Sequence, residues 1–223
     1  MMTGSDASRA LATVRTDFER LAAALLRFAS ELPTSTIHEA AGRIGALPAA
    51  IKPLDAHFRV CGPAVTVHSP AGDNLWLHRA IYLAQPGDVL VVDVEGGYEF
   101  GYWGEIMSCA ARQRGLAGLV INGCVRDGAT LASSDFPVFA RGLCMRGTGK
   151  DYGARGWINY PTLIEDVVVR PGDLIVGDYD GVVAIPRTLV ADVVEKSVAR
   201  EAKEASILKR LGQGERTLDI YSF

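Results

Sequence analysis

Three side chains that can do chemistry lie near the middle of the chain. One comes at the start of a predicted helix, and the other two follow the strand that comes after that helix. Glu105 is a carboxylate that can move a proton. Arg126 is a planar cation that can grip a carboxylate or oxyanion in two places. Asp127 is the type of oxygen ligand that Mg²⁺ takes together with several waters. In one pocket these groups favour C–C bond cleavage beside a carbonyl, because the ion and the arginine would both stabilise the enolate.

The surrounding elements predict that the three residues share a pocket. A continuous apolar run over 88–94 is typical of a buried strand, and the following pattern predicts a helix over 105–114 and a strand over 116–123. In a right-handed strand–helix–strand unit, the loops after both strands lie at the same edge of the sheet. The first N–H groups of the helix would face that edge, where an anionic carboxylate binds well. We expect four glycines of the first loop to leave room for a ligand: Gly96, Gly97, Gly101 and Gly104.

Ordinary structural roles also fit these residues. An adjacent arginine and aspartate in a turn often form a surface ion pair, and the helix macrodipole favours a glutamate in the first turn. A Schiff-base aldolase would need a lysine in an apolar pocket, and Lys150 is the one lysine near the predicted site. Four histidines show no metal-binding spacing and are expected to be structural: His38, His57, His68 and His78. The functional interpretation depends on the predicted convergence with the glycine-rich loop.

Composition and charge narrow the class of protein. The chain has 223 residues, of which 48% are hydrophobic and 22% charged, as in ordinary globular proteins. A net charge of -3 without a basic run gives no attraction for phosphate backbones, so nucleic acid is not an expected partner. Because no secretory signal and no long apolar run are present, we expect a cytoplasmic protein without membrane contact. Four cysteines without a CxxC pair predict buried free thiols: Cys61, Cys109, Cys124 and Cys144.

The rest of the pattern predicts one compact α/β domain with helices at both ends. Apolar residues at helical spacing predict a helix over 6–31, and Thr36 is a good N-cap for a second helix. A strand over 58–68 should break at Gly62 and Pro63. Further predictions are a helix over 74–85, strands within 136–139, 165–173 and 174–186, a functional loop or interface arm over 141–160, and a helix over 188–211. The expected division is an N-terminal helical arm (1–32), an α/β domain (33–187) and a C-terminal helix with its tail (188–223).

Several motifs in the same order resemble a known family. The segment WGEIMSCAARQRGLAGLVINGCVRDGATL, followed by FPVFARG, closely resembles the RraA-like family, which includes the 4-hydroxy-4-methyl-2-oxoglutarate aldolases. The resemblance extends from about Thr36 through GPAVTV, AGDN, PGDVLVVD and RPGDLIVGDYDGVVAIP. It therefore covers most of the chain.

The resemblance implies a fold and a set of site residues. The fold would be an αββα sandwich of the swivelling-domain kind, and the site would lie between subunits of a trimer, often paired into a hexamer. The residue matching Arg126 contacts the substrate, and the one matching Asp127 binds Mg²⁺ or Mn²⁺ partly through waters. The substrate would also be bound, largely through backbone amides, by the segment matching Gly104, Glu105, Ile106 and Met107.

The resemblance also implies an activity. We expect a divalent-metal-dependent class II pyruvate aldolase that cleaves a 4-hydroxy-2-oxo acid, such as 4-hydroxy-4-methyl-2-oxoglutarate, to pyruvate, with oxaloacetate decarboxylation as a side activity. The alternative is a non-enzymatic regulator, since the family also contains a ribonuclease inhibitor, although those regulators lack the aspartate matching Asp127. The aldolases carry Asp where this chain has Glu105, so substrate preference should differ. A neighbouring subunit would supply a third acid, for which Asp178 and Asp180 are candidates.

Overall fold

Four parallel strands form the centre of the structure, a computed structural model that describes residues 13–223. Each strand is rich in apolar residues, as expected where both faces are covered. Across the sheet they follow the order β5 (Val138–Leu143), β4 (Gly118–Val125), β3 (Val89–Asp93) and β2 (Val60–His68). Because all four run the same way, their carboxyl ends lie at one edge of the sheet.

Strand β2 extends the sheet by changing its partner halfway along. Its residues 64–68 pair in parallel with β3, whereas 60–63 pair antiparallel with β9 (Leu174–Asp178). The predicted break at Gly62 and Pro63 is therefore wrong, because the strand runs through both residues. Gly62 serves close packing instead, since a Cβ there would lie 2.3 Å from the carbonyl oxygen of Gly87. The remaining strands are β1 (Lys52–Pro53), β6 (Trp157–Ile158), β7 (Thr162–Ile164), β8 (Val167–Val169) and β10 (Gly181–Ile185).

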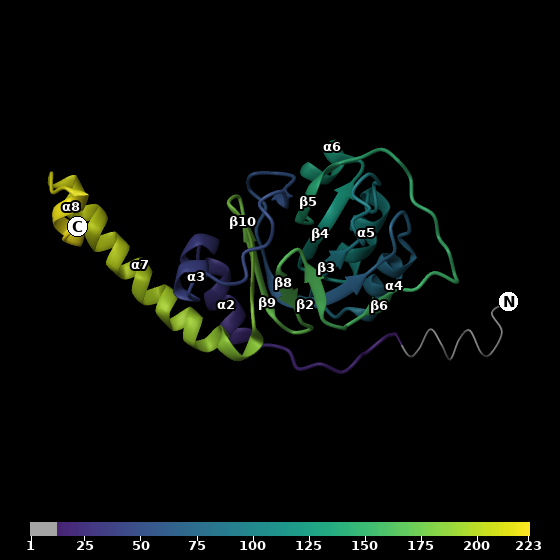
Figure 1. Cartoon of the computed structure of the whole chain (residues 1–223), viewed down its shortest axis with the longest axis horizontal. Helices are drawn as coiled ribbons and strands as arrows, with labels where there is room; N and C mark the ends of the chain where they lie inside the picture. The colour runs from purple at the N-terminus through teal and green to yellow at the C-terminus, as the bar shows by residue number, and fades with distance from the viewer. Residues whose placement is uncertain (1–12) are drawn as a thin grey trace.

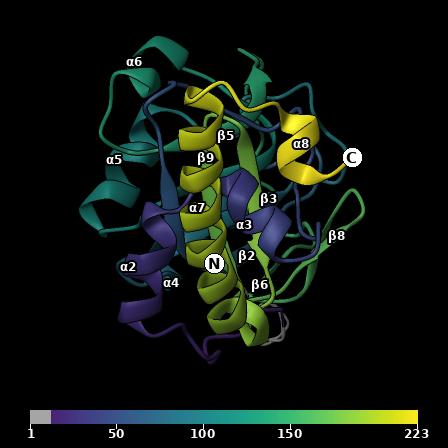
Figure 2. The same cartoon turned by 90° about the vertical axis from the view of Figure 1, so that its left-hand side faces the viewer.

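Three apolar cores separate the layers of the molecule. The first lies between strands β2 to β5 and two helices, α4 (Leu75–Leu83) and α5 (Glu105–Gln113). The second lies between those strands and β9, β10 and the β7–β8 hairpin. The third joins β9 and β10 to α2 (Ala23–Glu31), α3 (Thr34–Ala40) and α7 (Val190–Gly212). Figures 1 and 2 show these two helical layers on opposite sides of the strands, which confirms the predicted αββα sandwich.

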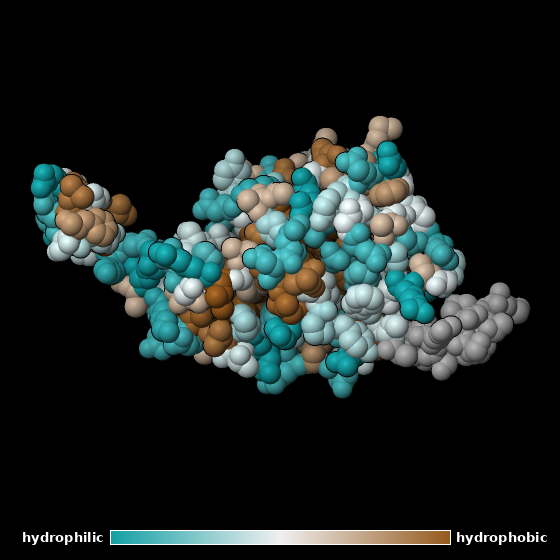
Figure 3. Space-filling model, in the orientation of Figure 1, coloured by the Kyte–Doolittle hydropathy of each residue, from teal (hydrophilic) through white to brown (hydrophobic). Residues whose placement is uncertain are grey.

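Helix α7 is longer than the layer that it covers. Its first half packs on α2 and α3, whereas its second half projects from the body and leads to α8 (Thr217–Tyr221) (Figure 1). The predicted C-terminal helix over 188–211 is thus confirmed. Apolar side chains remain exposed along this arm and at its tip, including Leu208 (67% exposed) and Phe223 (87%) (Figure 3).

The N-terminal helix is shorter than its apolar spacing predicts. Residues 13–22 are not helical, and α2 begins at Ala23; residues 6–12 of the predicted helix lie outside the described part of the chain. The N–H of Arg15 donates to the carbonyl oxygen of Ile158 (3.1 Å), and Arg20 forms a two-point ion pair with the buried Asp88. These long-range contacts hold the segment extended, so tertiary structure overrides the local helical pattern.

Two smaller predictions also need correction. Thr36 is not an N-cap but lies inside α3, whose first residue, Thr34, is held by the distant Asp178: its N–H and hydroxyl donate to the two carboxylate oxygens at 2.9 and 2.7 Å. The cysteines are free, but Cys109 is exposed and the other three are only half-buried.

Within residues 13–223, no helix is both long enough and apolar enough to cross a membrane.

Candidate active site

The structure brings Glu105 and Asp127 into direct contact. The backbone N–H of Glu105, the first residue of α5, donates to Oδ2 of Asp127 at 3.0 Å. Asp127 follows β4 in a left-handed conformation (φ 60°) and begins α6 (Gly128–Ala132). Its carboxylate therefore caps the amino-terminal end of α5 from a neighbouring loop, where the helix dipole favours negative charge.

The glycines of the first loop make room mainly for the protein itself. A Cβ on Gly104 would lie 2.4 Å from Oδ2 of Asp127, and one on Gly101 would lie 2.2 Å from the carbonyl oxygen of Cys144. A Cβ on Gly97 would lie 2.5 Å from the hydroxyl oxygen of Tyr102. The expectation that these glycines leave space for a ligand is thus wrong at three of the four positions. Gly101 and Gly104 are needed because the loop lies against the Arg126–Asp127 turn, and Gly97 because the loop folds back on Tyr102.

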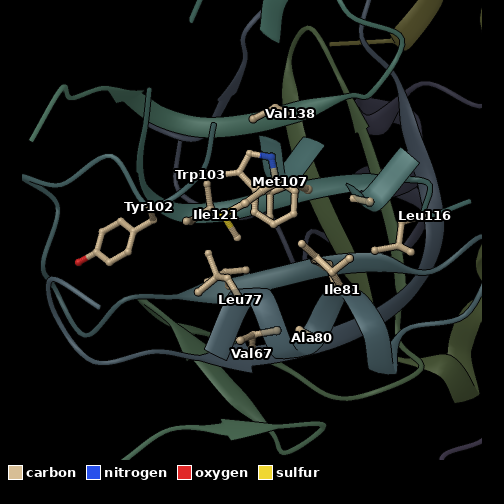
Figure 4. Packing of buried hydrophobic residues seen from close by; sticks show 14 of the residues in the cluster. Val67, Leu77, Ala80, Ile81, Tyr102, Trp103, Met107, Leu116, Ile121 and Val138 are labelled. Carbon is tan, nitrogen blue, oxygen red and sulfur yellow. The ribbon is translucent and has the colours of Figure 1, made fainter. Parts of the chain in front are cut away.

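Backbone hydrogen bonds fix this turn against the loop. The N–H of Arg126 donates to the carbonyl oxygen of Trp103 at 2.8 Å, and that of Tyr102 donates to the carbonyl oxygen of Cys124 at 3.0 Å. Residues 101–103 therefore act as a short extra strand beside the end of β4. Trp103 is fully buried and anchors the loop in the core, where it lies beside Met107 of α5 (Figure 4).

Tyr102 anchors the loop a second time. Its hydroxyl donates to the carbonyl oxygen of Gly97 at 2.7 Å and accepts from the N–H of Gly72 at 2.8 Å. Burial raises the pKa of this phenol, so the hydroxyl keeps its proton in neutral solution. The two anchors give the turn before Glu105 little freedom to move.

The three side chains predicted to do chemistry are exposed. Arg126, Asp127 and Glu105 all reach solvent, and among residues 13–223 none of the three takes part in an ion pair. The interpretation of Arg126 and Asp127 as an ordinary surface ion pair therefore has no support. Glu105 lines a cavity of about 250 Å³ between α5 and α6, together with Arg112 and several hydroxyl side chains.

The first turn of α5 offers backbone amides rather than side chains. In the described chain, the N–H groups of Ile106 and Met107 have no acceptor, whereas that of Ser108 is bonded to Gly104. The Met107 side chain packs into the core and is only 5% exposed (Figure 4), so Met107 can reach a ligand only through its backbone. Ile106 is 81% exposed. Two free amides at a helix amino terminus suit a carboxylate.

The residues at the site fit a divalent cation that keeps most of its water. No group of three or more His, Cys, Asp or Glu side chains that could hold a metal occurs within residues 13–223. Asp127 nevertheless has one oxygen, Oδ1, that accepts no hydrogen bond from any described residue. One carboxylate oxygen with waters is a common arrangement for Mg²⁺.

The structure assigns other roles to several residues considered from the sequence. Asp178 caps α3, and the backbone oxygen of Asp180 accepts a hydrogen bond from Lys52. His68 stacks on Trp157 with ring centroids 3.7 Å apart.

A contribution that the sequence did not reveal comes from the 141–160 segment. The N–H of Gly101 donates to the carbonyl oxygen of Arg146 at 2.8 Å, and the N–H of Gly149 donates to that of Gly72 at 2.7 Å. Part of the segment therefore lies against the site loop. No local signal could have found these contacts, because they are made by the backbone.

The fold and the site together define an αββα sandwich protein with free helix amides and a carboxylate at the carboxyl edge of its parallel strands. The chain belongs to the RraA-like family (Aldolase/RraA), which matches residues 34–184, so the family predicted from the motifs is confirmed. A protein of Halalkalibacterium halodurans, provisionally named 4-hydroxy-4-methyl-2-oxoglutarate aldolase, is 38% identical over 173 residues, which cover 78% of this chain and 81% of the relative.

Solved structures give the same relationship. An uncharacterised protein of Pseudomonas syringae pv. tomato is similar with a TM-score of 0.78 and 28% identity, covering 90% of this chain and 93% of the other. The chain is also similar to RraAS2 of Streptomyces coelicolor, which is described as an unusual member of the RNase ES inhibitor RraA family. The TM-score is 0.74 and the identity 26%, and the match covers 85% of this chain and 98% of RraAS2.

Proposed function

We propose that this protein is a divalent-metal-dependent pyruvate aldolase, which cleaves a 4-hydroxy-2-oxo acid such as 4-hydroxy-4-methyl-2-oxoglutarate and also decarboxylates oxaloacetate. The observation that carries the proposal is the contact between the Asp127 carboxylate and the amino-terminal end of α5, with Arg126 beside it. The candidate cation ligand Asp127, the free amides of α5 and the guanidinium of Arg126 thus come from adjoining parts of the chain. The aldolase name of the H. halodurans relative supports the same activity.

Each residue would have a separate task. The free amides of Ile106 and Met107 would bind the substrate carboxylate, and Arg126 would face the developing oxyanion. Asp127 would hold Mg²⁺ or Mn²⁺, which when bound supplies positive charge for the oxygens of the 2-oxo acid. Glu105 would take the proton of the 4-hydroxyl group as the C3–C4 bond breaks. The electron pair of that bond would enter the pyruvate enolate, and C3 of the enolate would then take the proton held by Glu105, which restores the carboxylate.

We also propose that the protein works as a homo-oligomer, a trimer or a hexamer, with the site between subunits. Three large apolar side chains near the site support this proposal: Ile106 (81% exposed), Leu143 (62%) and Met145 (93%). Leu143 lies where a Cβ on Gly128, the neighbour of Asp127, would meet it at 2.6 Å. Exposed apolar groups around a polar site are typical of a surface that another chain covers.

A pyruvate-release assay tests the proposal. The panel contains several 4-hydroxy-2-oxo acids and oxaloacetate, each with Mg²⁺, with Mn²⁺ and with EDTA. We expect release with either metal and none with EDTA. No release from any substrate, combined with inhibition of a ribonuclease by the protein, would instead favour the regulatory function named for RraAS2.

A further inference from the structure

A second group of polar side chains lies at the same edge of the sheet, one from each of four neighbouring strands. His68 ends β2, Asp93 ends β3, Asn122 lies near the end of β4, and Arg141 lies in β5. His68 is paired with Asp93 across the sheet, and Asp93 with Asn122. Because side chains alternate along a strand, these four lie on the face opposite α5, next to the second core. None of them has a task in the proposed reaction.

Hydrogen bonds join the four side chains into one network. Oδ1 of Asp93 accepts from Nδ2 of Asn122 at 3.2 Å, and Oδ2 of Asp93 lies 3.2 Å from Nδ1 of His68. Oδ1 of Asn122 accepts from Nε of Arg141 at 2.7 Å. Arg141 also forms an ion pair with Glu165, in the turn of the β7–β8 hairpin. Asp93 is thus in direct contact with His68 and Asn122, and Asn122 links it to Arg141.

Two members of this network reach the loop that leads to Glu105. The first is Asp93, whose Oδ2 accepts from the N–H of Glu95 at 3.2 Å; Glu95 has a left-handed backbone (φ 51°). The second is Arg141, at the end of the network, whose guanidinium lies 4.1 Å from the centroid of the Tyr98 ring; the Tyr98 hydroxyl donates to Glu165 at 3.2 Å. Left-handed backbone at a glutamate is unfavourable, so it persists only where surrounding contacts hold it.

Burial makes the network costly to disturb. The side chain of Asp93 is 14% exposed, and Asn122 as a whole is 2% exposed. A buried polar group that loses its partner costs about 1–3 kcal/mol, whereas the intact network satisfies each group. If the network is broken, the change that costs least free energy is movement of loop 95–104 toward solvent, because water can then reach the polar groups.

We propose that Asp93 is a positioning residue for the candidate active site. It holds the start of loop 95–104, and this loop ends at Gly104, whose contact with Asp127 places the free amides of α5. The proposal rests on the proposed function for its effect on turnover, but not for its effect on the loop. A displaced loop would move the amides relative to Asp127, and misplacement by about 1 Å can cost on the order of a hundredfold in rate.

The chain offers a matched control for this residue. Asp88 is also a buried aspartate, but it lies immediately before β3, at the opposite edge of the sheet, where it accepts from Arg20 at 3.0 and 2.9 Å and from the N–H of Gln85 at 2.8 Å. Replacing either aspartate by asparagine removes one buried, paired charge, at one end of β3 or the other. A general loss of stability would affect the two variants alike.

The test combines hydrogen exchange with kinetics in Asp93→Asn and Asp88→Asn. In Asp93→Asn we expect faster exchange of the amides over residues 95–107, together with a fall of about tenfold to a hundredfold in kcat/KM for pyruvate release, as both kcat and KM change. In Asp88→Asn, neither the exchange over residues 95–107 nor kcat/KM should change. Each variant is measured the same number of degrees below its own Tm. If Asp93→Asn does not fold, Arg141→Gln tests the other end of the network with the same measurements.

The outcomes separate the two proposals. Unchanged exchange over 95–107 in Asp93→Asn, or an equal change in Asp88→Asn, would overturn the positioning role whatever the kinetics show. A wild-type protein without pyruvate release would count against the proposed function, and the exchange pattern would still decide whether Asp93 holds the loop.

Discussion

The carboxylate of Asp127 accepts a hydrogen bond of 3.0 Å from the backbone N–H of Glu105. One carboxylate therefore does two things: it caps α5 and it is the group proposed to hold the cation. Because the cap fixes the distance between the cation site and the helix amides, the two binding functions share one geometry. Variants at Asp127 must therefore separate its effect on the stability of α5 from its effect on cation binding.

Asp127→Asn and Asp127→Ala make that separation. Both should abolish pyruvate release at saturating Mg²⁺, because neither has the negative charge. Asparagine keeps an oxygen for the Glu105 N–H and tolerates the left-handed backbone, so its Tm should stay near wild type. Alanine loses the cap, at a cost of about 0.5–2 kcal/mol, and its Tm should fall by several degrees. Full activity of either variant would remove Asp127 from the metal site.

Arg126→Ala should lower kcat/KM for pyruvate release by a factor on the order of hundreds, equivalent to roughly 3 kcal/mol of transition-state stabilisation. The reason is that its exposed guanidinium has no ion-pair partner among residues 13–223 and is available to an anionic substrate. Steady-state kinetics measure the effect. Arg43→Ala, which removes an exposed arginine paired with Glu39 beside α3, is the control and should behave as wild type. Wild-type kinetics in Arg126→Ala would mean that this arginine has no part in the reaction.

Gly104→Ala should impair the site through one contact. The backbone of Gly104 has φ -156°, which any residue adopts, so the effect comes only from the added Cβ, 2.4 Å from Oδ2 of Asp127. We expect a loss of about 1–3 kcal/mol in the free energy of unfolding and a reduced kcat. Urea unfolding and kinetics check this. Gly153→Ala, whose nearest contact would be 3.4 Å away, should change neither quantity.

The cysteines should differ widely in their reaction with iodoacetamide. Burial raises the pKa of the Cys61 thiol to about 11, although Arg59 partly offsets the effect, so at pH 8 only about one thousandth of it is thiolate. Cys109 is exposed on α5 and should be alkylated first. Mass spectrometry over a time course gives the order. Modification of Cys61 before Cys109 would contradict the burial seen here.

Asp93 should make stability depend on pH. Burial by itself raises the pKa of this carboxyl, but hydrogen bonds from His68, Asn122 and the Glu95 N–H together hold it below its ordinary value of 3.8. The folded protein then binds fewer protons here than the unfolded chain, so the stabilisation exists above pH 3.8 and is lost as the pH falls through the lowered pKa. The Tm difference between wild type and Asp93→Asn should therefore shrink as the pH falls below 3.8. A Tm difference that is constant with pH would show that the negative charge of Asp93 does not contribute to stability.

Much of the fold follows from local pattern. The parallel strands, α5 and the long helix α7 were predictable because continuous apolar runs and helical spacing report burial directly. The N-terminal segment was not, because Arg15 and Arg20 form contacts with residues far along the chain that outweigh the helical spacing. The cap of α3 was missed for the same reason, since it comes from Asp178, on a strand near the other end of the sequence.

The sequence by itself determined which residues meet at the carboxyl edge, because a right-handed strand–helix–strand unit returns the chain to that edge and so brings Arg126 and Asp127 to the start of α5. Only the tertiary structure decided which atoms face one another there. It shows that Asp127 caps α5, that Gly104 is needed for that contact, and that Asp93 accepts from the N–H of Glu95 while it contacts side chains of two neighbouring strands. The physical reason is that hydrogen bonds and close contacts depend on distances of a few tenths of an ångström, which periodicity does not encode.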